Sequence, residues 1–129
     1  MGALLVSNFT TQTPKDLGKK GEEIAACFFE SQGCKILARN HRIGRLEVDL
    51  ILQDQDCLVF VEVKTRKGGL EDSLMAVDRK KQSHIREAAE KYCLENGWEL
   101  QPRFDVVSIH YTYGKWNLEH FPNSFTIFD

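Results

Sequence analysis

Acidic and basic residues interrupt two neighbouring apolar stretches of this chain. Asp49 follows Glu47 by two positions, and Lys64 follows Glu62 by two positions. Two carboxylates about 5 Å apart, completed by a backbone carbonyl and waters, form the oxygen-rich site that Mg²⁺ requires. A lysine beside such a pair can orient a nucleophile or stabilise a phosphate. The residue types and their spacing therefore point to metal-assisted hydrolysis.

The later stretch, Cys57 to Thr65, is predicted to be a strand that is apolar on both faces until its end. Side chains alternate faces along a strand, so Glu62 and Lys64 follow Phe60 on one face. A strand of this kind is normally central and covered, where an unpaired charge is costly. The two charged residues therefore need partners on a neighbouring strand.

The preceding strand, predicted over residues 45 to 53, supplies those partners. If the connecting turn is centred between residues 55 and 56, the numbers of paired residues sum to a constant. The pairs that follow are Asp49 with Glu62 and Glu47 with Lys64. The opposite face of the strand is predicted to carry Val48, Leu50 and Leu52.

Opposed carboxylates destabilise a sheet unless a cation lies between them. Lys64 can serve in part, and a divalent metal is the functional alternative. The structural alternative is an ion network of these four charged residues without catalysis. A register slip of one residue would separate Asp49 from Glu62.

Length and composition predict one globular domain. The chain has 129 residues, of which 42% are hydrophobic and 28% charged, so it has material for one core. We expect a flexible arm over residues 1–13 and a single domain over residues 14–129. The predicted order is a helix (14–32), strands (34–41, 45–53, 57–65), a loop to about 77, a helix (78–96) and strands (104–111, 116–121). This order favours an α/β fold with a mixed sheet flanked by helices.

The net charge of −2 excludes a uniformly basic nucleic-acid-binding domain, so any such site must be local. The chain shows no stretch long enough to span a membrane and no secretory signal, so we expect a cytoplasmic protein with no membrane partner. The four cysteines lack Cys-x-x-Cys spacing, which favours reduced thiols in the core over structural zinc. The four histidines are predicted to lie at surface or edge positions.

A local basic set surrounds the carboxylates and could contact phosphates without reading base sequence. Its members are Arg39, Arg42, Arg45, Arg66, Lys67, Lys80 and Lys81, together with the amide of Gln82. The alternative is an ordinary solvated surface. Lys81 and Gln82 could also approach the metal site.

Several short motifs carry a resemblance to known nucleases. Residues 47–51 (EVDLI) and 60–66 (FVEVKTR) resemble the acidic residue plus Glu-x-Lys signature of the PD-(D/E)xK superfamily. Residues 18–25 (GKKGEEIA), 80–82 (KKQ) and 103–107 (RFDVV) resemble the bacterial YraN-like family, and that match runs from about residue 15 to the end. One departure is Leu46, which stands where the family usually has glycine.

The YraN-like family is similar to archaeal Holliday-junction resolvases, so the resemblance implies a restriction-endonuclease-like fold. It implies catalytic roles for Glu22, Asp49, Glu62 and Lys64. Asp49 and Glu62 would bind Mg²⁺ or Mn²⁺, with the backbone carbonyl of Val63 as a further ligand and Glu22 acting through water.

Two functions follow as expectations. The first is a metal-dependent DNA nuclease acting on branched or junction DNA as a homodimer, since symmetric cleavage of a two-fold junction needs two sites. The second is a non-catalytic module that binds nucleic acid or another partner and retains the nuclease fold.

Overall fold

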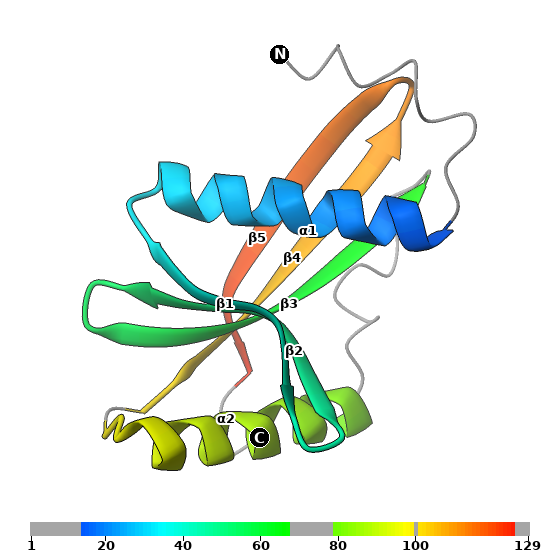
Figure 1. Ribbon diagram of the computed structural model, residues 1–129. Helices are drawn as coiled ribbons and strands as arrows, with labels where there is room; N and C mark the ends of the chain where they lie inside the picture. Colours follow the sequence, from blue (N-terminus) through cyan, green and yellow to red (C-terminus); the bar gives the residue numbers. More distant parts are fainter. Residues whose placement is uncertain (1–13, 68–78, 100, 126–129) are drawn as a thin grey trace.

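The computed structural model describes residues 14–67, 79–99 and 101–125, which form two helices and one five-stranded sheet (Figure 1). The elements are α1 (Pro14–Ser31), β1 (Lys35–Ile43), β2 (Leu46–Asp54), β3 (Cys57–Lys67), α2 (Arg79–Asn96), β4 (Arg103–Thr112) and β5 (Lys115–Phe125). This order confirms the predicted mixed α/β fold. The predicted arm, residues 1–13, and most of the predicted loop before α2 lie outside the described residues.

The strands lie in the sheet in sequence order, from β1 to β5. The pair β3–β4 is parallel, and the other three pairs are antiparallel. The parallel pair requires a long crossover connection, and α2 lies within it. β3 is therefore the central strand, as its apolar sequence predicts.

The two helices cover opposite faces of the sheet (Figure 1). Ala25, Ala26 and Phe29 of α1 pack in one buried cluster with the side chains of β3 that include Val59 and Val61. The other buried cluster joins residues of α2 to the alternate side chains of β3, Leu58 and Phe60. Glu62 and Lys64 continue this second row, so they lie on the α2 side of the sheet.

The β2–β3 hairpin has the predicted register. The observed pairs run from Asp54–Cys57 to Leu50–Val61, and their residue numbers sum to the predicted constant. The turn places Gln55 at a φ of 57°, a conformation uncommon for residues other than glycine. Continuing this register by one residue sets Asp49 opposite Glu62.

The ladder between β2 and β3 ends at Leu50–Val61, and beyond it the β1–β2 hairpin bends toward α2 (Figure 1). Val48 accordingly joins the α2-side cluster, whereas Leu50 stays on the α1 side. The prediction that Val48 shares a face with Leu50 is therefore wrong. The predicted pairing of Glu47 with Lys64 is also wrong, because β2 has already left β3 at that point.

The bend falls at one position of both hairpin strands. Between the pairs Arg39–Leu50 and His41–Val48, the β1–β2 register omits Asn40 and Asp49. Asn40 has a φ of 46°, and asparagine is among the residues that tolerate this left-handed region best. The bend thus frees the side chain of Asp49 from regular strand geometry.

A close contact fixes α1 against β3. Gly21 is buried, and a Cβ atom at this position would overlap the side-chain oxygen of Thr65. Glycine therefore permits the helix to approach the strand more closely than any other residue would. The next residue of the helix is Glu22, so this contact sets where Glu22 lies. Gly21, the second glycine of residues 18–21 (GKKG), thus serves the packing of the helix.

Two expectations about sulfur and imidazole groups need correction. All four cysteines are free, but Cys27 and Cys57 are exposed rather than in the core. His110 is fully buried on the interior strand β4 rather than at a surface or edge, and its Nε2 lies 2.6 Å from Ser108 Oγ. None of the helices within the described residues is long and apolar enough to cross a membrane.

Candidate active site

The candidate active site lies where β2 separates from β3. The N–H of Val63 donates a hydrogen bond of 2.8 Å to Oδ2 of Asp49. The Asp49 carboxylate therefore takes a place that a backbone carbonyl would hold in an unbroken ladder. Side-chain hydrogen bonds also join Asp49 to Glu62 and to Glu22. Three acidic side chains thus meet in a row with Asp49 at its centre.

The environment of Asp49 disfavours its negative charge. Burial, followed by the negative charge of Glu62, raises the pKa of Asp49 from 3.8 to about 7. The hydrogen bond from Val63 and the positive charge of Lys81 oppose this shift but do not cancel it. Carboxyls that share a hydrogen bond must hold a proton between them, and a cation can take the place of that proton.

Glu62 is the most deeply buried member of the row and is 4% exposed. Its Oε2 lies 3.4 Å from Nζ of Lys64 and 3.7 Å from Nζ of Lys81. Its Oε1 is buried and has no hydrogen-bond partner among the described residues. A buried carboxylate oxygen without a partner is costly, which makes this atom a candidate ligand position.

Glu22 reaches the site from α1. Burial raises its pKa, and the negative charges of Asp49 and Glu47 raise it further, while a hydrogen bond from the side chain of Asn40 lowers it. Asn40 is a member of the site that the sequence analysis missed. Its left-handed conformation at the bend in β1 brings its amide to Glu22, and the period-two pattern of the strand gives no sign of that bend.

The three carboxyls do not by themselves enclose an ion. Within the part of the chain that the structure describes, no three histidine, cysteine, aspartate or glutamate side chains gather closely enough to hold a metal. A cation bound by Asp49 and Glu62 would need water for its remaining ligands. Mg²⁺ commonly binds in this way, with one or two carboxylates and several waters. A donor set of carboxylate oxygens completed by water fits Mg²⁺.

The predicted basic residues lie in several places. Arg39 and Arg42 are exposed on β1, Arg45 is exposed in the β1–β2 turn, and Arg66 is exposed on β3. Lys80 is exposed in the first turn of α2, and the next residue, Lys81, reaches Glu62. The side chain of Lys67 lies outside the described part of the chain.

Gln82 has contacts of its own. It accepts a hydrogen bond of 3.1 Å from Arg86, and it lines a cavity of about 440 Å³ together with His120 and Phe125.

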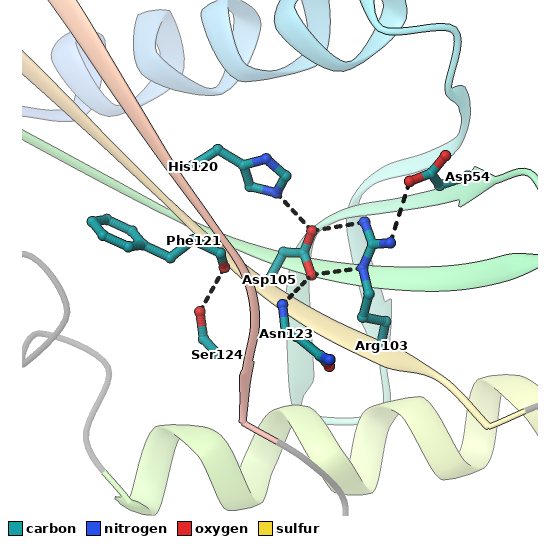
Figure 2. Close-up of polar contacts among 7 residues, drawn as sticks. All are labelled: Asp54, Arg103, Asp105, His120, Phe121, Asn123 and Ser124. Atoms are coloured by element: carbon teal, nitrogen blue, oxygen red, sulfur yellow. Dashed lines mark hydrogen bonds and ion pairs between the residues drawn. The ribbon is translucent and has the colours of Figure 1, made fainter.

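A second buried carboxylate, Asp105 of β4, has a complete set of partners (Figure 2). Arg103 donates two hydrogen bonds of 3.0 Å, one to each oxygen. His120 lies 2.7 Å from Oδ2, and the N–H of Asn123 donates to Oδ1 at 3.0 Å. Arg103 also donates to Asp54 of β2 at 3.2 Å. We call these five residues the Asp105 network, and it ties β2, β4 and β5 together.

Comparison with known proteins identifies a family whose members resemble most of this chain. Residues 21–109 match the family described as "Uncharacterised protein family UPF0102". A UPF0102 protein of Syntrophotalea carbinolica is 42% identical over 115 residues, which cover 86% of this chain and 92% of the relative. One from Lawsonia intracellularis is 38% identical over 116 residues, 88% of each chain. One from Pelotomaculum thermopropionicum is 42% identical over 117 residues, 86% of this chain and 96% of the relative. Residues Glu22, Asp49, Glu62 and Lys64 all fall inside the matched region.

Proposed function

The chain belongs to UPF0102, the uncharacterised YraN-like family, and we propose that it is a metal-dependent nuclease that hydrolyses phosphodiester bonds in branched or junction DNA. One observation supports this proposal above the others. Asp49 and Glu62 are hydrogen-bonded to each other in a buried site, and Glu62 Oε1 has no partner among the described residues. A network built only for stability would satisfy that oxygen.

Mg²⁺ or Mn²⁺ would be held by Asp49 and Glu62, with the carbonyl of Val63 as a further ligand and Glu22 acting through water. Such an ion supplies a water of lowered pKa and offsets the charge that develops on the phosphate. The side chains of this chain would supply the proton transfer and the remaining stabilisation of the phosphate. Burial raises the pKa of Glu22, so its carboxylate is suited to accept a proton from the attacking water.

Lys64 and Lys81 are the cations nearest to the carboxylates. Both ammonium groups approach the same oxygen of Glu62, and both side chains are partly exposed, Lys64 at 26% and Lys81 at 38%. They are therefore held beside the site and can still reach a phosphate. We assign Lys64 to the orientation of the nucleophile or the stabilisation of the pentavalent phosphate. We assign Lys81 to the stabilisation of the negative charge on the same phosphate.

The exposed arginines and lysines of β1, β3 and α2 would bind the DNA backbone. Arg39, Arg42, Arg45, Arg66, Lys67 and Lys80, with Gln82, form this proposed set. Contacts of this kind recognise phosphates and the shape of the DNA rather than its sequence. A preference for branches, flaps or junctions follows from that mode of binding.

Cleavage of end-labelled linear, flap and four-way-junction DNA with Mg²⁺ or Mn²⁺ tests the proposal. Asp49→Asn should lower the cleavage rate by roughly 10²-fold or more, because the metal contributes several kcal/mol to such a reaction. The matched control is Asp56→Asn, the same change at an exposed turn residue, which should leave the rate unchanged. Equal rates in wild type and Asp49→Asn would contradict the proposal.

A second measurement follows the metal without cleavage. Mg²⁺ should raise the melting temperature of the wild type, because a ligand that binds only the folded state stabilises it. Asp49→Asn should abolish that rise. A junction that shifts in a gel but is not cut would instead favour the non-catalytic binding module.

A homodimer is part of the proposal for junction DNA, because each chain carries one such site. Analytical ultracentrifugation with and without a four-way junction measures the assembly. Two chains bound per junction are expected, and one chain per junction would restrict the proposed substrate to flaps or ends.

A further inference from the structure

A groove lies beside the candidate active site, between the β1–β2 turn and α2. It encloses about 830 Å³. One wall is formed by residues 44–47, and the other by Lys80, Lys81, His84, Glu87 and Lys91. These α2 residues recur at helical spacing, so they form one face of the helix. The bend in the β1–β2 hairpin creates the groove, because it carries the turn toward α2 (Figure 1).

The groove carries a surplus of positive charge although the whole chain is acidic. Arg45, Lys80, Lys81 and Lys91 line it, against the two carboxylates Glu47 and Glu87. Glu87 is already paired with Lys91 at 3.4 Å. Neither Arg45 nor Lys80 has an ion-pair partner among the described residues. Two cations on opposite walls are thus available to an anionic ligand.

The groove leads to the candidate metal site through Lys81. The same side chain lines the groove and lies 3.7 Å from Glu62. From Lys80 to Lys91 the basic face of α2 extends about 16 Å at the rise of an α-helix. A chain of phosphates that lies along this face therefore brings its next phosphate to the buried carboxylates.

We propose that this groove binds one unpaired strand of nucleic acid by its phosphates and delivers it to the cleavage site. This inference rests on the proposed nuclease function and narrows its substrate to DNA with a single-stranded segment, such as a flap or an overhang. The groove is as large as the pockets that hold small ligands, about 300–1,000 Å³. A volume of this size is filled by a few nucleotides of one strand, and it is far smaller than one turn of a DNA duplex.

Fluorescence anisotropy of the full chain without divalent metal tests the inference separately from cleavage. The probes are a labelled oligodeoxythymidylate, an oligouridylate of the same length and a blunt DNA duplex of that length, each titrated over a series of salt concentrations. The groove variant is Arg45→Gln combined with Lys80→Gln. The matched control is Lys35→Gln combined with Lys115→Gln, which removes two exposed charges distant from the groove.

We expect the single strands to bind more tightly than the duplex. The groove variant should reduce the slope of log K against log salt by about 1.4, and weaken single-strand binding by roughly ten- to thirty-fold at 0.1 M salt, since each lost contact accounts for about 0.7 of the slope. The control pair should bind as the wild type does. Tighter binding of the oligodeoxythymidylate than of the oligouridylate is expected, and the reverse order would overturn the assignment of the groove to DNA.

Duplex binding as tight as single-strand binding, or a groove variant that behaves like the control, would overturn the inference. Either result leaves metal-dependent cleavage by the wild type intact, so it does not bear on the proposed cleavage activity. Loss of single-strand binding in the groove variant, together with no cleavage of any DNA by the wild type, would overturn the proposed nuclease activity. It would still support single-strand binding by the groove.

Discussion

The protein buries acidic side chains in two regions that treat them differently. Asp105 is fully buried and receives two hydrogen bonds from Arg103, one from the Asn123 N–H and a contact from His120. Glu62 is almost as deeply buried, yet its two lysine contacts reach only one oxygen. Its neighbour Asp49 keeps a pKa near 7.

The difference separates a carboxylate that holds the fold together from a pair whose burial leaves one oxygen without a partner among the described residues. In the Asp105 network both carboxylate oxygens have partners, so burial leaves neither of them unsatisfied. At Asp49 and Glu62 like charges are held together and one oxygen has no partner among the described residues. Strain of this kind persists only where the rest of the structure compensates for it, and it is typical of functional sites.

The largest expected effect on stability comes from the Asp105 network. Asp105→Ala should lower the free energy of unfolding by about 3–5 kcal/mol, because it leaves a buried network without its central charge. Urea unfolding followed by circular dichroism measures this change. A loss below about 1 kcal/mol would show that the network is no stronger than a surface ion pair.

Asp49→Asn should change the free energy of unfolding in the opposite direction. The raised pKa means that folded Asp49 keeps its proton up to about pH 7, whereas the unfolded chain releases it near pH 4. Wild-type stability therefore falls as the pH rises from about 4 to about 7, by up to about 4 kcal/mol. Asn carries no such charge, so the variant should be more stable than the wild type at pH 8.

Melting curves over a pH series without metal check this expectation. The stability difference between Asp49→Asn and the wild type should grow from pH 4 to pH 7 and then level off. A variant that melts at a lower temperature than the wild type at pH 8 would favour the structural ion network. Asp49 would then stabilise the fold, as Asp105 does.

Gly21→Ala tests how the candidate site is positioned. The added methyl group would overlap Thr65, and overpacking of this kind costs about 1–3 kcal/mol. The control is Gly18→Ala in the same helix, where the new methyl group meets nothing within 4 Å. That change should stabilise the protein by up to about 1 kcal/mol, since alanine favours helices. Thermal unfolding of both variants compares them directly.

The smallest expected effect is that of Asp54→Ala, at the rim of the Asp105 network. Asp54 is 36% exposed and touches Arg103 at 3.2 Å, so its loss should cost less than about 1 kcal/mol. Urea unfolding beside Asp105→Ala gives the comparison. A cost as large as that of Asp105→Ala would mean that Arg103, rather than Asp105, is the centre of the network.

The sequence was sufficient to predict the element order and the register of the β2–β3 hairpin. The alternation of β3 and the length of the turn place Glu62 and Asp49 side by side. Both are local properties, since strand period and hairpin length fix the pairing once the turn is located. Lys81 is predicted, together with Gln82, to approach the carboxylates, and it contacts Glu62.

Other features could not be predicted because they depend on irregular backbone. The bend at Asn40 and Asp49 moves Val48 to the other face of the sheet, which a period-two pattern cannot show. The Asp105 network depends on a bulge in β5, where the register shifts between Phe104 and Val106 and Asn123 takes a φ of 56°. Irregularities of this kind arise from tertiary packing and leave weak local signals.

The close fit of Gly21 against Thr65 has a consequence for the chain during its synthesis. The carboxyl row takes Glu22 from the first helix and Asp49 and Glu62 from two strands of the hairpin, and its two lysines come from β3 and the second helix. These residues meet only after the first helix has docked on a strand that is synthesised much later. An unfinished chain on the ribosome thus carries these acidic side chains one after another, and the carboxyl row assembles only when the strands and helices that supply it have all been made.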